Sequence, residues 1–265
     1  KKFILIFLLL ITHFAPGQQL GAYFGFSIFH IPNETSFIET YISVIGETVN
    51  YKDTSNKLQG KIKIEYNISK DNKIIFIDSY YLLSPKLNKE DKKINFIDQQ
   101  RIALKNGNYK LQILISDAYA EIEPYKYEQE FIINYTNENV QFSDIQFIEE
   151  YKKSGKNNIL NKSGYNLTPF ASDFFNENFN ELIFYNEIYF TDKKIGDNKN
   201  LLLNYFIESY ENNELVISSN RFKKIKTNNV IPILDKINID NLPTGNYRLV
   251  IEVRDIKNNL IAKNE

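Results

Sequence analysis

One eleven-residue pattern occurs twice in this chain, and no other feature constrains the fold as strongly. The first copy runs from Gly107 to Asp117 and the second from Gly245 to Asp255. Apolar side chains occupy alternate positions in both copies: Tyr109, Leu111, Ile113 and Ile115 in the first, and Tyr247, Leu249, Ile251 and Val253 in the second. A period of two places these side chains on one face of a β-strand. The pattern therefore predicts two equivalent strands, each with one buried and one solvated face.

The residues that open each copy have structural explanations. Gly107 and Gly245 are expected to occupy turns with positive φ, a conformation that glycine adopts without a Cβ clash. Tyr109 and Tyr247 stand where immunoglobulin-like sandwiches bury a tyrosine ring and bond its hydroxyl to the backbone. We therefore predict that both tyrosines are core residues rather than exposed rings that stack on a ligand. The aspartates that close the copies, Asp117 and Asp255, complete this structural set.

The spacing of the two copies indicates a duplication. They lie 138 residues apart, about half the length of the chain, and similar hairpin-like stretches begin upstream at Tyr66 and Tyr205. Two tandem domains of one kind account for this offset, and each has an ordinary domain size. We place the first domain at residues 18–137 and the second at residues 138–265. A polar joint at residues 136–139 separates them.

The remaining segments predict an all-β chain. Short apolar-alternating stretches recur about every ten residues, bounded by turn residues such as Asp71-Asn72, and no convincing helical period is present. This pattern favours two tandem immunoglobulin/fibronectin-III-like β-sandwich domains. We expect strands at residues 20–31, 37–45, 61–69, 74–82, 96–104, 108–116 and 127–135, then at 141–151, 165–170, 181–190, 201–210, 215–220, 230–239, 246–254 and 260–262.

The first residues have the composition of a signal peptide. Lys1 and Lys2 precede an apolar run at residues 3–11 that is too short to span a bilayer comfortably. Small residues follow, so we predict cleavage after Gly17 and an exported mature chain; an uncleaved anchor is the alternative. Without cysteine, a lipoprotein is excluded. Because the sequence lacks an initiator methionine and ends abruptly, we expect it to be clipped at both ends.

Composition excludes several functional classes. The net charge is −1, and no basic patch of the kind that binds nucleic acid is present. The absence of cysteine rules out thiolate catalysis, disulfides and zinc-thiolate sites. Aromatic residues are abundant, with 20 Phe and 18 Tyr, but tryptophan is absent.

Few residues are suited to catalysis. Once the signal peptide is removed, His30 is the one histidine left, and no G-x-S-x-G nucleophile motif accompanies it. Glu149 and Glu150 are adjacent, so on a strand they face opposite sides and cannot act together. We therefore predict no catalytic residue, although carboxylates from separate strands could still meet.

No metal or cofactor motif is present either. The segment from Asp192 to Asp197 comes nearest to a calcium loop, but it contains two lysines and lacks the alternating ligands. We interpret it as a solvated hairpin turn. Glycine loops that bind phosphate are also missing, so we predict neither a metal nor a cofactor.

Four phrases carry a family resemblance. They are FIDQQR at 96–101 with the Gly107-Asn-Tyr strand that follows, NILNKSGY at 158–165, LNYFIESY at 203–210 and LPTGNYRLVIEVRD at 242–255. Together they resemble the amino-terminal region of the GWxTD-domain proteins of Bacteroidetes. The signature itself is absent, because this chain contains no tryptophan. The resemblance implies an exported, envelope-associated protein of a Gram-negative bacterium, in the periplasm, at the outer membrane or on the surface. It supplies no catalytic residue.

These observations predict a scaffold or protein-binding module without catalytic activity. Its partner would be an envelope protein, bound through strand edges or apolar patches. We expect no nucleic-acid partner and no membrane span after signal cleavage. The alternative is a carbohydrate-binding module that uses exposed tyrosines, for example in the runs at residues 79–81 and 125–127. An exposed, coplanar row of rings would favour that alternative.

Overall fold

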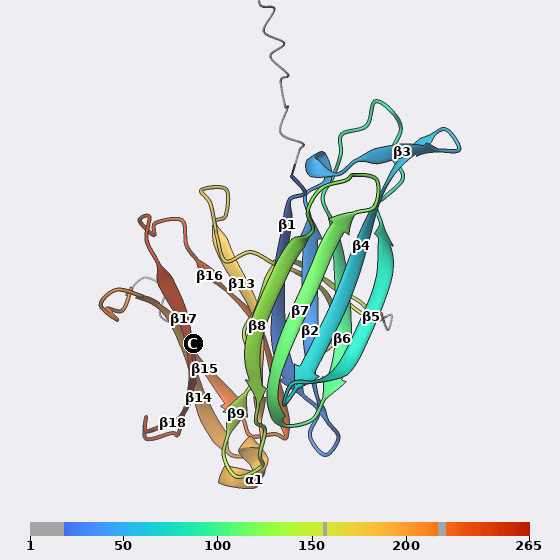
Figure 1. Ribbon diagram of the computed structural model, residues 1–265. Helices are drawn as coiled ribbons and strands as arrows, with labels where there is room; N and C mark the ends of the chain where they lie inside the picture. The colour runs from blue at the N-terminus through green and yellow to red at the C-terminus, as the bar shows by residue number, and fades with distance from the viewer. Residues whose placement is uncertain (1–18, 156–157, 217–220) are drawn as a thin grey trace, which may run out of the picture.

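Antiparallel β-sheets make up nearly the whole molecule, which confirms the all-β prediction (Figure 1). The computed structural model describes residues 19–155, 158–216 and 221–265. The signal peptide expected at residues 1–17 lies outside the described residues. Among the described helices, none combines the length and the apolar character needed to cross a bilayer.

Residues 20–135, here called the N-terminal unit, form two facing sheets. One sheet has the order β1-β2-β6, from strands β1 (Ala22–His30), β2 (Ser36–Val44) and β6 (Phe96–Leu104). The other has the order β3-β4-β7-β8, with β5 on the opposite edge of β4 from β7. Its strands are β3 (Tyr51–Thr54), β4 (Lys57–Lys70), β5 (Lys73–Leu83), β7 (Gly107–Asp117) and β8 (Tyr125–Ile133), and the short helix η1 (Gly46–Thr48) precedes β3.

Residues 140–264, here called the C-terminal unit, also form two sheets. The first has the order β11-β12-β10-β13-β16, with β9 beside β13. Its strands are β9 (Gln141–Phe142), β10 (Gln146–Lys153), β11 (Asn161–Lys162), β12 (Tyr165–Pro169), β13 (Glu181–Tyr189) and β16 (Val230–Asn238). The second has the order β15-β14-β17-β18, from β14 (Asn200–Ser209), β15 (Arg221–Lys226), β17 (Tyr247–Arg254) and β18 (Leu260–Asn264). The short helix α1 (Thr191–Ile195) joins β13 to β14.

The two halves share one connectivity. The sheet order β5-β4-β7-β8 corresponds strand by strand to β15-β14-β17-β18, and β1-β2-β6 corresponds to β10-β13-β16. The repeated pattern of the sequence occupies the equivalent strands β7 and β17, each in the interior of its sheet. Each half has its own apolar core, built from inward-facing residues such as Ile64 and Leu111 in one, and Leu203 and Ile251 in the other.

Turn chemistry agrees with the sequence at one position and differs at two. Asp71 and Asn72 have φ angles of 50° and 61°, as a type I′ turn requires between β4 and β5. Gly107 and Gly245, however, do not have positive φ, so that prediction is wrong. A Cβ on Gly107 would lie 2.5 Å from Lys70 Nζ, the far end of a flexible side chain that can move aside. A Cβ on Gly245 would lie 3.4 Å from the Tyr247 phenol oxygen, which is an ordinary van der Waals distance.

The two tyrosines differ in burial. Tyr109 is buried and donates its hydroxyl hydrogen bond to Lys105 O at 2.7 Å. Tyr247 donates to Pro243 O at 2.9 Å, but its ring is only half-buried, so it is not the full core residue that we expected. The bond to a carbonyl four residues upstream has the geometry of a tyrosine corner.

The closing aspartates satisfy backbone donors in different ways. Asp117 is buried and accepts hydrogen bonds from Asn50 N at 2.7 Å and Tyr119 N at 2.8 Å. Asp255 is half-buried and organises its own turn by accepting from Asn259 N at 2.8 Å. These hydrogen bonds, with the Asn259 side chain contributing most, hold the pKa of Asp255 below its usual range.

Two further expectations need correction, and a third lies mostly outside the described residues. Of the strand expected at residues 215–220, residues 217–220 are not described; Leu215 makes an isolated bridge to Glu208, and β15 begins at Arg221. The segment at Asp192 is not a hairpin turn, because α1 crosses from one sheet to the other. Glu252 of β17 lies on the strand face that we expected to be solvated, yet its side chain is buried. Its Oε2 accepts a hydrogen bond from Arg254 Nε at 2.8 Å.

The tyrosine corner predicts unequal effects of two matched substitutions. Tyr109→Phe removes the bond to Lys105 O inside the core, so we expect a loss of about 1 kcal/mol in the free energy of unfolding. Tyr247→Phe removes the equivalent bond at a wetter site and is expected to cost less. Urea denaturation of both variants measures the difference, and equal losses would contradict this explanation.

Candidate interaction surfaces

A buried charge cluster joins the two units. Glu39 projects from β2 on the sheet face turned towards the C-terminal unit, and its side chain has no exposed area. Arg101, directly opposite on β6, contacts Glu39 Oε2 at 2.5 Å. Lys162 of β11 reaches Glu39 Oε1 at 2.6 Å, and Tyr41 donates to the same oxygen at 3.0 Å. One carboxylate is thus neutralised from both units.

Lys162 is the less expected member of this cluster. Its ammonium lies 3.6 Å from the centre of the Phe29 ring and donates to Gln146 Oε1 at 2.7 Å. Burial lowers the pKa of Lys162 to about 8, against the opposing effect of the Glu39 carboxylate. Removing an ammonium from water is costly, so a buried lysine needs such partners.

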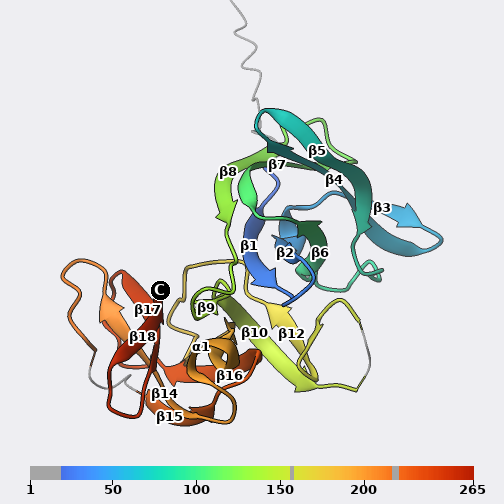
Figure 2. The same ribbon diagram turned by 90° about the horizontal axis from the view of Figure 1, so that it is seen from below.

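The edge of β1 that faces away from β2 forms a second contact between the two units. Ile28 N donates to Asp144 Oδ2 at 2.9 Å, and Ile28 O accepts from Asp144 N at 3.0 Å. Two residues further, His30 N donates to Tyr189 OH at 3.0 Å. These backbone groups point away from β2, where a neighbouring strand would normally pair. The C-terminal unit therefore replaces a strand at this edge (Figure 2).

Aromatic rings surround this edge. The His30 ring stacks on Tyr135 with centroids 4.8 Å apart and meets the edge of Tyr189 at 5.7 Å. Its Nδ1 lies 3.0 Å from Ser36 Oγ. Desolvation, followed by the charge of Lys193, lowers the pKa of His30. These contacts make His30 a packing residue of the junction.

Sequence reasoning did not find this junction. Its members come from strands up to 123 residues apart in the chain, from Glu39 to Lys162, and each looks like an ordinary solvated residue in its own segment. One signal was available. The burial pattern of β2 extends to both of its faces, and its sequence SFIETYISV has Phe37 and Tyr41 on one parity and aliphatic side chains on the other.

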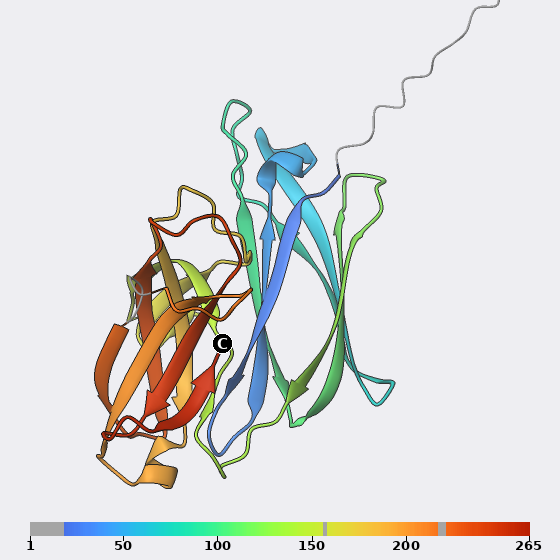
Figure 3. The same ribbon diagram turned by 90° about the vertical axis from the view of Figure 1, so that its left-hand side faces the viewer.

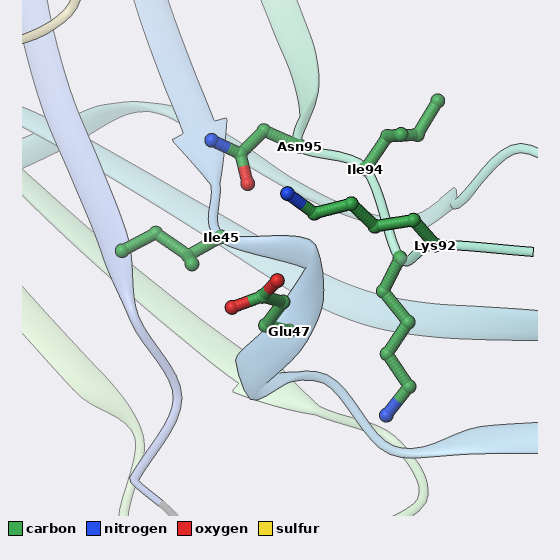
Figure 4. Close-up of a pocket in the computed structure, with 6 residues that line it drawn as sticks. Ile45, Glu47, Lys92, Ile94 and Asn95 are labelled. Atoms are coloured by element: carbon green, nitrogen blue, oxygen red, sulfur yellow. The ribbon is translucent and has the colours of Figure 1, made fainter.

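Surface hollows offer little for catalysis. Of the two best-formed hollows on the described part of the chain, the larger has a volume of about 440 Å³ and is lined by Ile45, Glu47, Ile94 and Asn95 together with Lys92 and Lys93. Figure 4 shows Glu47 as the one carboxylate among its labelled side chains. The smaller hollow, of about 160 Å³, is lined by Asn200, Leu202, Lys224 and Ile256. Neither contains the pair of carboxylates that an acid–base mechanism would need.

The charged segments singled out in the sequence are dispersed. Glu150 pairs locally with Lys152 at 3.2 Å on β10. Asp192 lies in α1, and among residues 19–155, 158–216 and 221–265 no three histidine or acidic side chains converge as metal ligands. Gly107, Tyr109 and Asp117 lie in the N-terminal unit, whereas Gly245, Tyr247 and Asp255 lie in the C-terminal unit. The structure does not bring the two sets together in one site.

Strand edges differ sharply in their protection against pairing. On β8 the outward residues include Lys126, Glu128 and Glu130. On β16 the third residue of the strand is Pro232. β15 is strongly basic, with Arg221, Lys223, Lys224 and Lys226. Charges and proline are the usual means by which proteins prevent edge-to-edge association.

The edge of β5 lacks such protection. This eleven-residue strand reads KIIFIDSYYLL, with one charge in its interior, Asp78, and no proline. Five large apolar side chains on it are exposed: Ile74, Ile75, Ile77, Tyr81 and Leu83. The strand lies on the side of the N-terminal unit that faces away from the C-terminal unit (Figures 1 and 2). We refer to it as the β5 edge.

Hydrogen-bond alternation shows which backbone groups this edge presents. Gly60 O accepts from Ser84 N, whereas Lys61 O accepts from Ala118 N on the opposite side. Even-numbered residues of β4 therefore bond to β5, and in an antiparallel ladder their partners on β5 are also even-numbered. The N–H and C=O groups of the odd-numbered β5 residues therefore point away from β4, and no described strand pairs with them. These residues are Ile77, Ser79, Tyr81 and Leu83.

Exposed tyrosines do not gather into a row. Among the described residues, Tyr23, Tyr81, Tyr151 and Tyr210 have the largest exposed fractions, between 40% and 60%. They belong to β1, β5, β10 and the turn after β14. This distribution lacks the coplanar platform on which sugars stack.

No family model matches the chain, and no curated protein matches it either.

The junction predicts coupling between Glu39 and Lys162. Lys162→Met leaves a buried carboxylate with one charged partner fewer, so we expect a loss of about 3–5 kcal/mol in the free energy of unfolding. The double variant Glu39→Gln, Lys162→Met removes both charges and is expected to lose less than the two single losses combined. A double-mutant cycle in urea measures the coupling. Additive losses would show that the pair is not coupled.

Asp144 predicts a pH dependence of stability. Burial raises the pKa of Asp144 to about 6 from 3.8, despite the bond from Ile28 N. The native chain thus retains this proton where the unfolded chain releases it. The resulting stabilisation is present at low pH and is lost as the pH rises through about 6, by about 3 kcal/mol at most.

Asp144→Asn isolates this effect, because its amide oxygen can still accept from Ile28 N but cannot ionise. Between about pH 4.5 and pH 7.5, we expect the wild-type free energy of unfolding to fall relative to that of the variant. Urea titrations at both pH values measure this difference. An unchanged difference would contradict the assignment.

Proposed function

We propose that this protein is an exported, non-catalytic scaffold whose two immunoglobulin/fibronectin-III-like sandwiches bind an envelope protein. The β5 edge is the observation that carries the proposal. A long strand with unpaired backbone groups and outward apolar side chains offers both hydrogen bonds and hydrophobic contact to an extended partner segment.

The shared connectivity supports the finer fold assignment. Three strands ordered β1-β2-β6 face four ordered β5-β4-β7-β8, and the second unit repeats this arrangement with additions at one sheet. Sequential antiparallel strands divided between two sheets in this way are typical of immunoglobulin-like and fibronectin-like sandwiches. Such modules commonly serve as spacers and binding platforms. The boundary that we propose lies at residues 137 and 138.

The junction supports a scaffold role. Glu39, Lys162 and Arg101 form one buried cluster, while Asp144 and the β1 backbone form a second connection beside it. Because these contacts combine apolar packing with directional bonds, they favour one orientation of the two units. The two units lie side by side (Figure 3). A fixed orientation would keep the β5 edge at a constant distance from the C-terminal unit.

Matched substitutions on two edges test the proposal. Ile77 on β5 and Ile132 on β8 are similarly exposed, at 72% and 66%, and lie on opposite edges of the same sheet. Ile77→Lys places a charge on the unprotected edge and is expected to reduce retention of the envelope partner at least about tenfold. Ile132→Lys is expected to leave it unchanged.

The measurement is affinity capture from solubilised envelopes by the tagged mature chain, quantified by mass spectrometry. Expression with residues 1–17 in place tests export, for which the expected product begins at Gln18. A partner retained equally by both variants would remove the β5 edge from the proposal. A chain confined to the cytoplasm would remove the export step.

A further inference from the structure

We propose that the β5 edge pairs with the β5 edge of a second copy of this chain, in antiparallel register about a two-fold axis at Ser79. The inference deepens the proposed function, because it rests on the same edge and specifies one partner for it. A symmetric pairing of this kind joins two five-stranded sheets into one continuous sheet across the dimer.

The outward backbone groups permit this pairing. Ile77, Ser79 and Tyr81 all direct their N–H and C=O groups away from β4, as the alternation of the ladder requires. In a register centred on Ser79, Ile77 faces the partner's Tyr81 and Ser79 faces the partner's Ser79. Each of these pairs brings outward groups together, so each can exchange two hydrogen bonds.

Side-chain chemistry favours the register centred on Ser79 over the register centred on Asp78. Centred on Ser79, the outer face pairs Ile77 with the partner's Tyr81 and Ile75 with the partner's Leu83, so apolar residues meet apolar residues. A register centred on Asp78 would instead place two carboxylates directly opposite each other, which is destabilising. The symmetric arrangement at Ser79 opposes no like charges.

The approach to this edge is open. In Figures 1 and 2 the β5 strand lies on the far side of the N-terminal unit from the C-terminal unit. On the neighbouring strand β4, the outward residues include Lys63 and Glu65, which pair with each other at 2.8 Å. These charges lie behind the edge rather than on it. A second copy would therefore meet the apolar strip of β5 first.

One contact regulates access to the centre of the edge. Ser79 N donates to Asp78 Oδ1 at 2.8 Å, so the carboxylate occupies the central donor in the single chain. Pairing at Ser79 requires this contact to open. We therefore expect Asp78→Ala to strengthen dimerisation, because it frees the donor and removes the one charge within the strand.

Charge-swap variants test the symmetric register. Ser79→Lys alone and Ser79→Asp alone each oppose two like charges across the axis, so analytical ultracentrifugation should show at least about tenfold weaker dimerisation than the wild type. An equal mixture of the two variants should form a heterodimer. Ile132→Lys, on the β8 edge of the same sheet, is the matched control and should dimerise like the wild type.

Disulfide trapping provides a second measurement, because the chain contains no cysteine. Ser79→Cys should form a covalent dimer on mild oxidation, whereas Ile132→Cys should not. A wild-type chain that remains monomeric, or a mixture of charge variants that fails to associate, would overturn the inference. If Ile77→Lys still abolished capture of an envelope partner in that case, the proposed function would stand and only the second copy would be rejected.

Discussion

The neutralisation of one buried carboxylate determines how the two halves of this molecule sit together. Glu39 has no access to solvent, and its charge is balanced by Arg101 from its own sheet and by Lys162 from the other unit. Separating the units would expose two of these charges to water but would also break the packing of Phe29 against Lys162. Such a cluster contributes directional specificity more than net stability, because desolvation offsets much of the ionic attraction.

The same junction explains which strand edges remain available. Docking of the C-terminal unit occupies the outward groups of β1 at Ile28 and His30. It also reaches the adjacent sheet face, where the side chain of Gln99 on β6 donates through Nε2 to Ile159 O at 2.9 Å. One sheet of the N-terminal unit therefore has its β1 edge closed by its neighbour. The other sheet is left with the charged β8 edge and the apolar β5 edge, and only the first has a charge pattern that resists pairing.

Much of the fold could be predicted from the sequence, because strand alternation and turn chemistry are local signals. The pattern around Tyr109 and Tyr247 identified equivalent strands, and Asp71-Asn72 formed the tight turn that its residue types favour. Tyr247 is less buried than Tyr109, since burial depends on what the opposite sheet places over the ring. The positive φ expected at Gly107 and Gly245 was wrong, because both glycines enter their strands without a left-handed residue.

The candidate surfaces were less accessible to sequence reasoning for a physical reason. The attraction between Glu39 and Lys162 depends on a docking geometry that no local pattern encodes. The β5 edge illustrates the opposite case: its run KIIFIDSYYLL was predicted as a strand, yet nothing local showed whether a neighbour would cover it. Once the sheet order is known, the composition of that edge becomes informative, because it can be compared with β8, β15 and β16 in the same molecule. Three edges carry charges or proline and one carries isoleucine, tyrosine and leucine; a strand that only had to remain solvated would gain nothing from those residues.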